Sequence, residues 1–389
     1  MHTRKQGHLF WGVVALVVLA MPSAARAELA GQEVKIGALV PLTGVLSYFG
    51  QQQRIALEIA TEEINAAGGI GGKPVRFIIF DTERKESTAI QAMRRLLSEQ
   101  VLAVFGPLSC RVVEAVFPIS MREHVPTISN SCGAPGIYPK FRPWTFGNVS
   151  TMVAANRDII ALWVKTHNIK RIAVIYDKAD DISRGYGAVV GPKLFEAHGV
   201  EILDRLTFVT SDIDFSAQIT RVKSLGVDGL VIGALAVPAA HVVREARKQG
   251  LAIPILGNRP VTGYNFIQLA GRDAEGVWAP AEFWPENPEP RVRAFTEKFL
   301  QRNPLKNPPH QVTAASYDST YITKMIIEQN GVTNKPEELA RDREKIRQGW
   351  AALKDYRGVM GITSLTETGE ALKEHYMLSV KDGKWVLVR

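Results

Sequence analysis

The chain has 389 residues, of which 46% are hydrophobic and 22% charged, and its formal net charge is +8. This length is too great for a single small core and predicts two domains. Charges of both signs are spread along the chain, without a basic stripe interleaved with aromatic residues, so the composition argues against a nucleic-acid-binding protein.

The first 27 residues have the features of a secretory signal peptide. Arg4 and Lys5 provide a positive start, an apolar core runs from Leu9 to Met21, and an Ala-Arg-Ala cleavage site occupies positions 25–27. The apolar core is too short to span a bilayer. We therefore expect a periplasmic protein that begins near Glu28 and carries a net charge of +5 after loss of three basic residues.

Strand-like and helix-like patterns alternate from residue 33 to about 278. The apolar run 34–40 is followed by turn residues, an amphipathic pattern over 52–66 and a second apolar run over 75–80. Such a βαβ unit implies a parallel sheet with helices on both faces. Further strands are expected at 101–106, 125–129, 171–176, 201–209, 228–233, 253–257 and 276–279, and helices at 87–100, 111–124, 154–166, 187–198, 215–225, 238–249 and 264–270.

The last third of the chain has a different pattern. Helices are expected at 291–302, 311–330 and 337–353, and a hairpin at 376–380 and 385–388. The whole pattern predicts an α/β protein built from doubly wound parallel sheets.

Several longer segments also carry a family resemblance. They are VPLTG at 40–44, INAAGGIGGKPV at 64–75, GPLSC at 106–110, VPTISNSCGAP at 125–135, RIAVIYD at 171–177, AASYDSTY at 314–321 and GVMGITSL at 358–365. In this order they resemble the solute-binding proteins of bacterial ABC transporters, of the leucine/isoleucine/valine-binding type.

The resemblance implies a type I periplasmic binding protein, with two lobes joined by a three-segment hinge. We expect an N-terminal lobe of residues 33–147 plus 279–374, and a C-terminal lobe of residues 148–278 plus 375–389. It further implies a monomer that holds a small molecule between closing lobes and delivers it to a membrane permease.

Enzyme motifs are absent from the sequence. There is no G-x-S-x-G, H-E-x-x-H or C-x-x-C. The glycine-rich segment 68–73 follows a helix and precedes a strand, the reverse of a phosphate loop, so it is interpreted as a helix end and a turn. The acidic pair Asp180-Asp181 is interpreted as a solvent-facing loop. We predict a protein that is not an enzyme and has no cofactor and no metal.

Two loops are candidates for binding the carboxylate of a ligand. The resemblance implies that loops 106–111 and 129–135 do so through hydroxyl and N–H groups at the starts of the following helices. Their candidate residues here are Ser109, Cys110, Ser131 and Gly133, the last standing where amino-acid binders carry Thr. Capping of those helices is the alternative role for the two serines.

The same loops contain the two cysteines, Cys110 and Cys132. Export to an oxidising compartment would allow them to form a disulfide. The bond requires Cα atoms within about 7 Å of each other. Free thiols near the cleft are the alternative.

Other candidate positions follow from the resemblance alone. Phe49 matches an aromatic residue that packs on the ligand, with Tyr48 as its competitor, and Leu235 falls where an aromatic often lies. Arg184 matches a Tyr that closes over the ligand. Two extra residues precede Arg184, so Tyr186 or Asp181 could take that place.

Arg259 departs most from the family pattern. Amino-acid binders carry an acid at the matching position, which pairs with the ammonium group of the ligand. An arginine would repel an ammonium group but suits a carboxylate. With Arg184 near the same cleft, the sequence favours an organic or aromatic acid over a plain amino acid. An amino-acid or amide receptor and a ligand-sensing module remain alternatives, as does an Arg259 that pairs with an acid of its own lobe.

Overall fold

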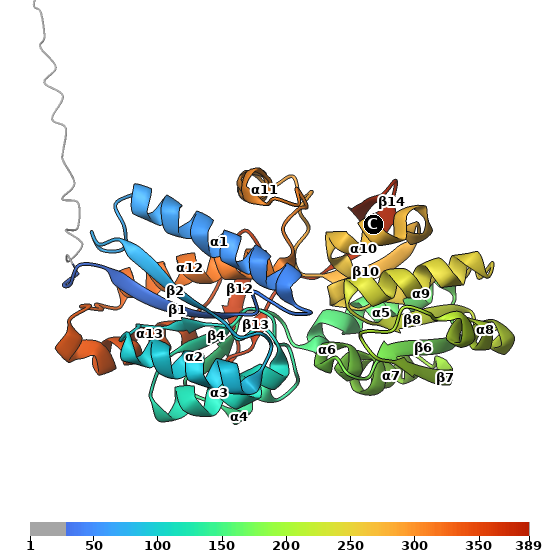
Figure 1. Ribbon diagram of the computed structural model, residues 1–389, viewed down its shortest axis with the longest axis horizontal. Helices are drawn as coiled ribbons and strands as arrows, with labels where there is room; N and C mark the ends of the chain where they lie inside the picture. Colours follow the sequence, from blue (N-terminus) through green and yellow to red (C-terminus); the bar gives the residue numbers. More distant parts are fainter. Residues whose placement is uncertain (1–28, 389) are drawn as a thin grey trace, which may run out of the picture.

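The computed structural model describes residues 29–388. The predicted signal peptide lies outside these residues. Two lobes lie side by side along the longest axis of the molecule, each with a sheet between layers of helices (Figure 1). The predicted α/β fold class with two parallel-sheet lobes is confirmed.

The sheet of the first lobe has five parallel strands in the order β2-β1-β3-β4-β5. Its strands are β1 (Val34–Val40), β2 (Val75–Asp81), β3 (Val104–Phe105), β4 (Thr127–Ser129) and β5 (Thr145–Gly147). Its helices are α1 (Ser47–Ala66), α2 (Glu86–Ser98), α3 (Cys110–Arg122), α4 (Ile137–Lys140), α11 (Pro290–Arg302), α12 (Gln311–Gln329) and α13 (Leu339–Ala351), with a 3-10 turn at Pro336–Glu338.

A small antiparallel sheet completes the first lobe. It consists of β11 (Tyr356–Gly358), β12 (Gly361–Leu365) and β13 (Ala371–Leu372). The backbone N–H groups of Val359 and Met360 donate to the buried Asp318 carboxylate of α12, each at 2.9 Å. This small sheet is therefore held against the lobe through α12.

The sheet of the second lobe has seven strands in the order β7-β6-β8-β9-β10-β14-β15, parallel as far as β10. They are β6 (Arg171–Asp177), β7 (Glu201–Phe208), β8 (Gly229–Gly233), β9 (Ile255–Gly257), β10 (Val277–Ala281), β14 (Tyr376–Lys381) and β15 (Lys384–Leu387). The helices are α5 (Met152–His167), α6 (Asp181–Arg184), a π-helix (Gly185–Val190), α7 (Gly191–Ala197), α8 (Ser216–Leu225), α9 (Ala236–Lys248) and α10 (Tyr264–Ala270), with 3-10 turns at Arg259–Thr262 and Gly271–Ala274.

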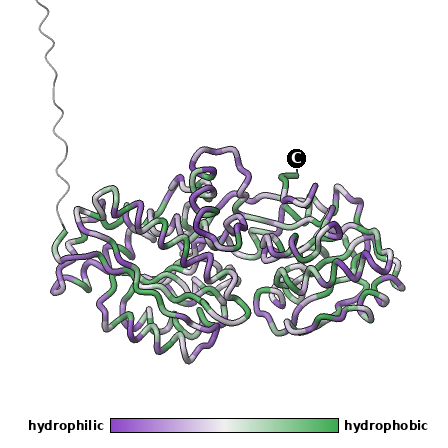
Figure 2. Tube along the Cα trace, turned by 45° about the horizontal axis from the view of Figure 1, so that its top comes forward, coloured by the Kyte–Doolittle hydropathy of each residue, from purple (hydrophilic) through white to green (hydrophobic). Residues whose placement is uncertain are grey.

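The apolar strand runs form the cores of both lobes. All five residues of β8 are buried, as a central strand covered by helices on both faces requires. Figure 2 shows hydrophobic segments through the middle of each lobe and polar segments toward the outside. Trp163 fills the core of the second lobe and Trp350 that of the first, both fully buried.

The chain passes between the two sheets three times. The crossings lie between β5 and α5, between β10 and α11, and between β13 and β14. The residue limits that we expected for the lobes stay a prediction, and the expected limit after residue 278 falls inside β10, which continues to Ala281 in the second sheet.

The glycine-rich segment after α1 forms a tight turn. Gly69 has a φ of +82°, and a Cβ atom there would lie 2.1 Å from the carbonyl oxygen of Lys73. Only glycine fits such a position. Within residues 29–388, no helix has both the length and the apolar character needed to cross a membrane.

Candidate functional site at the cleft between the lobes

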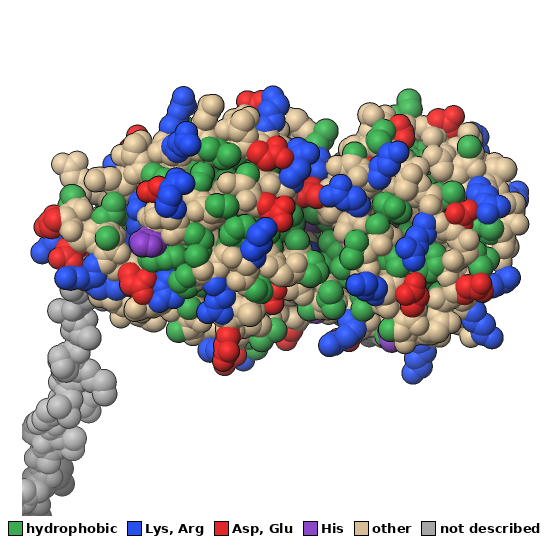
Figure 3. Space-filling model, turned by 90° about the horizontal axis from the view of Figure 1, so that it is seen from below, with side chains coloured by type: hydrophobic (Ala, Val, Ile, Leu, Met, Phe, Trp, Pro, Cys, Tyr) green, Lys and Arg blue, Asp and Glu red, His purple; other side chains and the backbone are tan. Residues whose placement is uncertain are grey.

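Four of the eight predicted site residues line one small cavity between the lobes: Phe49, Ser131, Leu235 and Arg259. The cavity has a volume of about 20 Å³, enough for about one water molecule. A ligand the size of an amino acid therefore requires the lining to move. Figure 3 shows the boundary between the lobes as a groove on the molecular surface. The other lining residues are Leu46, Leu108, Ile182, Pro260, His310, Gln311 and Val312.

Most of the cavity wall is apolar. Phe49, near the start of α1, packs with Leu108 after β3 and with Leu235 after β8 in one buried cluster. Because Leu235 follows a strand of the second lobe, this cluster joins the two lobes. Phe49 also lies 4.9 Å, ring centre to ring centre, from His310. Its competitor Tyr48 packs edge-on against Phe49 and does not line the cavity.

The Arg259 guanidinium group is already paired with an acid. Its Nη1 donates to Oε1 of Glu282 at 2.7 Å and to the carbonyl oxygen of Ser150 at 3.3 Å. The two charged side chains are 6% and 0% exposed. Of the alternatives left open by the sequence, the structure therefore has an Arg259 that is paired with an acid. Arg259 also lines the cavity, and both of its side-chain hydrogen bonds use Nη1.

Glu282 lies where the three chain crossings meet. Its Oε1 accepts from the backbone N–H of Ser150 at 3.1 Å, in the crossing before α5. The same atom lies 3.9 Å from Nε2 of His375, in the crossing before β14. Glu282 itself follows β10 directly. One buried carboxylate thus contacts Arg259 and all three connections between the lobes, and sequence reasoning missed it.

The glycine at position 133 makes room for Arg259. A Cβ atom on Gly133 would lie 2.8 Å from Nη2 of Arg259 and 2.5 Å from the carbonyl oxygen of Ser150. Such distances are too short for a side chain to be tolerated without movement. The two departures from the family pattern are therefore linked, since the guanidinium group occupies the space that a larger residue 133 would need.

His310 is neutral in this environment. It is buried beside the cavity, and burial with a repulsive contribution from Arg259 lowers the pKa of His310 to about 3. Its Nδ1 accepts from the backbone N–H of Val312 at 3.4 Å, which caps α12. Arg259 is thus the cation that lines the cavity, and Glu282 offsets its charge.

The two candidate carboxylate-binding loops are joined by a disulfide between Cys110 and Cys132, with their Cα atoms 5.0 Å apart. Of the two possibilities left open by the sequence, the structure has the bond. The disulfide leaves neither cysteine with an S–H group, and both side chains are buried, so neither offers a donor to a ligand. The bond fixes the start of α3 against the loop after β4.

The side chain of Ser109 bonds to the other lobe and not to its own helix. It occupies the N-cap position of α3, yet its side chain makes no capping bond. Its Oγ lies 3.1 Å from Oδ2 of Asp181, which belongs to the second lobe. The same Oδ2 accepts from the backbone N–H of Arg111 at 3.0 Å. We call Ser109 Oγ and Arg111 N–H the anion cradle.

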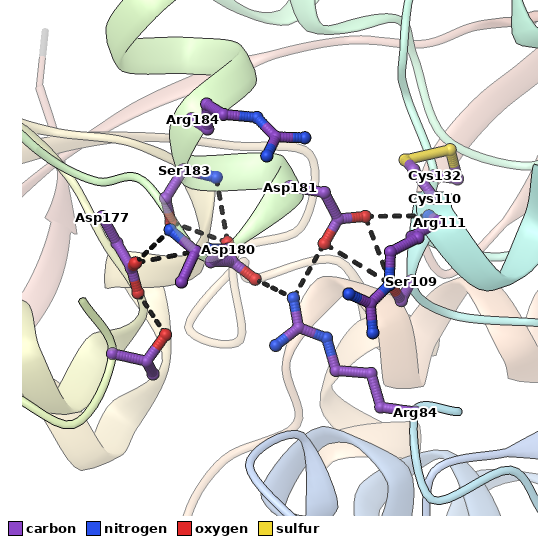
Figure 4. A network of polar contacts seen from close by, with 12 residues as sticks. Arg84, Ser109, Cys110, Arg111, Cys132, Asp177, Asp180, Asp181, Ser183 and Arg184 are labelled. Atoms are coloured by element: carbon purple, nitrogen blue, oxygen red, sulfur yellow. Dashed lines mark hydrogen bonds and ion pairs between the residues drawn. A yellow bond between two sulfur atoms is a disulfide. The ribbon is translucent and has the colours of Figure 1, made fainter. Parts of the chain in front are cut away.

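Arg84 adds a second contact between the lobes (Figure 4). Its Nη2 lies 2.7 Å from Oδ1 of Asp180 and 2.8 Å from Oδ1 of Asp181. The interpretation of these acids as solvent-facing is wrong, because Asp180 is buried and Asp181 half-buried. The predicted site residue Arg184 is exposed, and its guanidinium group donates to the carbonyl oxygen of Lys178 at 3.5 Å.

A larger cavity lies elsewhere, in the first lobe. It has a volume of about 740 Å³ and contains none of the predicted site residues. Glu63 in its wall accepts from the hydroxyl groups of Tyr317, at 2.5 Å, and Tyr321, at 2.7 Å. Throughout the part of the chain that the structure describes, no three His, Cys, Asp or Glu residues are grouped so as to hold a metal ion.

Two α/β lobes, three crossings and a lined cleft define the class of two-lobed binding proteins, in which a ligand lies between the carboxyl ends of two sheets. The chain belongs to the periplasmic binding protein family, whose model matches residues 33–384. Homologues in this family are solute-binding components of ABC transporters.

Two relatives illustrate the similarity. The chain is 26% identical to a leucine-, isoleucine-, valine-, threonine- and alanine-binding protein of Pseudomonas aeruginosa, over 83% of this chain and 85% of the relative. A branched-chain amino acid transporter substrate-binding protein of Streptococcus pneumoniae, solved with isoleucine, is 25% identical with a TM-score of 0.81, covering 91% of this chain and 98% of the other.

A third relative is similar in fold. It is a solute-binding protein of an ABC transporter from Rhodopseudomonas palustris, solved in complex with benzoate. It is 21% identical with a TM-score of 0.80, covering 92% of this chain and 96% of that one.

Proposed function

We propose that this protein is the exported ligand receptor of an ABC importer and binds a small organic acid with a largely apolar body. It works without catalysis, as a monomer, and presents the closed complex to a membrane permease. The signal peptide at residues 1–27 directs it to the periplasm. The ligand lies between an N-terminal lobe, with proposed limits 33–147 plus 279–374, and a C-terminal lobe, with proposed limits 148–278 plus 375–389, except that β10 stays in the second lobe to its end at Ala281.

The observation that carries the ligand class is Arg259 at a mostly apolar cavity. Its recorded hydrogen bonds all use Nη1, so Nε and Nη2 remain as donors for a carboxylate or carbonyl oxygen. Because Glu282 already offsets the charge of Arg259, the lining supplies no net positive charge for a second carboxylate, which argues against a dicarboxylate. Phe49, Leu108 and Leu235 supply the apolar contacts for an aromatic or branched aliphatic body.

A second candidate is an amino-acid receptor. The Pseudomonas aeruginosa relative carries branched-chain amino acids in its name, and its similarity extends over 83% of this chain. The ammonium group of such a ligand would have to tolerate Arg259, with Glu282 as the nearest compensating acid. The two candidates therefore differ in which member of the Arg259–Glu282 pair contacts the ligand.

A thermal-shift screen followed by calorimetry distinguishes the two candidates. The chain from Glu28 onward is tested with benzoate, 4-methyl-2-oxopentanoate, isoleucine and leucine. A ligand at 100 times its Kd stabilises the folded state by about 2.7 kcal/mol. We expect one of the acids to raise the melting temperature and the amino acids to leave it unchanged. A shift with isoleucine or leucine but with neither acid would replace the first proposal by the second.

Two arginine variants serve as a matched pair for whichever acid binds. Arg259→Gln removes a charged donor from the cavity, so we expect Kd to rise by about 10- to 150-fold. Arg184→Gln removes an exposed arginine that does not line the cavity, so its Kd should stay within about twofold of the wild type. Ser131→Ala provides a milder change in the cavity if Arg259→Gln does not fold. Equal effects of the two arginine variants would contradict the assignment of Arg259.

A further inference from the structure

The anion cradle is already filled by a side chain of the protein itself. Asp181 is the first residue of α6 in the second lobe, and its carboxylate accepts from both Ser109 Oγ and the Arg111 N–H of the first lobe. These donors stand at the start of α3, where free N–H groups and the helix dipole favour an anion. Asp181 therefore makes the contacts that a ligand carboxylate would make there.

Arg84 reinforces this contact from the first lobe. It pairs with both Asp180 and Asp181, and its side chain is only 13% exposed. Arg84 and its neighbour Glu83 both have positive φ values, 58° and 50°. Two consecutive non-glycine residues in this region are uncommon and cost free energy, so the loop holds Arg84 in an unfavourable backbone conformation in which it reaches the second lobe.

The two aspartates have separate roles in this network. Asp180 caps α6, since its Oδ2 accepts from the N–H and the hydroxyl of Ser183 at 2.9 and 2.7 Å. Burial and the neighbouring carboxylate raise the pKa of Asp180. Burial also acts to raise the pKa of Asp181, but the hydrogen bonds from Arg111 and Arg84 outweigh it and lower that pKa. Asp181 is thus held as the anion.

We propose that Asp181 is a built-in occupant of the anion cradle, which latches the two lobes together and keeps the cradle from an outside carboxylate until it is displaced. The proposal rests on the proposed function in one respect, that the cradle belongs to the ligand-binding cleft. An internal competitor acts at a millimolar effective concentration, set by the hinge that connects the lobes. Weak carboxylates are therefore rejected at the cradle.

A first experiment measures closure without any ligand. Small-angle X-ray scattering gives the radius of gyration of the wild type and of Asp181→Ala, Arg84→Ala and the control Asp158→Ala. Asp158 is exposed on α5 of the second lobe, where its carboxylate pairs with the neighbouring Arg157. We expect both latch variants to be more extended than the wild type and the control to match it. A radius unchanged in both latch variants would overturn the latch.

A second experiment measures access to the cradle with acetate as the probe. The ¹⁵N-labelled backbone amide of Arg111 is followed by NMR during an acetate titration. In Asp181→Ala we expect this amide to shift with an apparent Kd at least about tenfold lower than in the wild type, while Asp158→Ala behaves as the wild type. The same titration curve in wild type and Asp181→Ala would show that Asp181 does not occupy the cradle.

These two measurements use no transported ligand. A failed ligand screen would therefore not count against the latch, and absence of the latch would not count against the result of the ligand screen. Folding of each variant is checked by circular dichroism. Asp181→Ser, which keeps a small polar residue at the first position of α6, replaces Asp181→Ala if that variant is unfolded.

Discussion

The cleft contains two groups of charges that behave in opposite ways. Arg259 and Glu282 form a buried pair within the second lobe and its crossings. Arg84 and Asp181 form a pair that joins the first lobe to the second. The first pair can stay intact while the lobes move apart, whereas the second must break. A charged residue in a cleft thus contributes to ligand binding, closure or both, depending on which lobe supplies its partner.

The strongest way to test this contrast is to remove the partner of Arg259. Glu282→Gln leaves a buried arginine without its counter-charge, and breaking such a pair costs about 3–5 kcal/mol. We expect the free energy of unfolding in urea to fall by that amount. Asp158→Asn, at an exposed pair, should change it by less than about 1 kcal/mol. A loss as small as that of the control would mean that Arg259 does not depend on Glu282.

A second test concerns the disulfide between Cys110 and Cys132, which fixes the start of α3 on the first-lobe side of the latch. The disulfide closes a loop with a sequence separation of 22 residues. A cross-link that closes a loop of this length stabilises the folded state by about 3 kcal/mol, mainly because it restricts the unfolded chain. The double variant Cys110→Ser, Cys132→Ser should lose about that much, measured by urea unfolding without reductant. The wild type in reductant is the matched control and should lose a similar amount. If neither condition lowers stability, the loops are held by packing alone.

The smallest expected effect is the pH dependence that arises from His310. Its folded pKa of about 3 lies below the ordinary value, so the unfolded state binds a proton first as pH falls. Stability from this group is complete above about pH 6.5 and is lost as pH falls toward 3, with about 2 kcal/mol lost by pH 5.

His310→Asn isolates this contribution, because asparagine also caps helices well. The free energy of unfolding of the variant should fall less than that of the wild type between pH 6.5 and pH 5. The difference between the two changes gives the contribution of His310 to the pH dependence of stability. Parallel pH profiles of wild type and variant would show that His310 accepts a proton in the folded cleft. The Arg259–Glu282 end of the cleft would then be more open to solvent than its burial indicates.

Much of the fold and part of the candidate site could be predicted from the sequence. The strands were predictable because their apolar runs are buried on both faces, as in β1 and β8. The strand β5 was missed, since three residues are too few to show a period. Phe49, Ser131, Leu235 and Arg259 were predictable cavity positions because they lie in the loops that the family resemblance marks for the ligand.

The partners of those positions could not be predicted in the same way. Arg259 and Glu282 are 23 residues apart, and Arg84 and Asp181 are 97 apart, so no local pattern connects them. Asp181 was one of three alternatives for closing over the cleft, yet its acidic neighbour made a solvent-facing loop the simpler interpretation. Only the folded chain shows that it reaches the start of α3.

Glu282 gives the cleft a mechanical property as well as an electrostatic one. Its carboxylate contacts residues of the crossings before α5 and before β14, and Glu282 itself lies in the third, so in the proposed closure it lies close to the axis of rotation of the lobes. Distances between the two lobes change little close to such an axis during rotation, and they change most far from it. In the proposed closure, a ligand at Arg259 is therefore bound close to the rotation axis, where distances change little. The contact of Asp181 with the first lobe lies farther from that axis, so its length changes more for the same rotation.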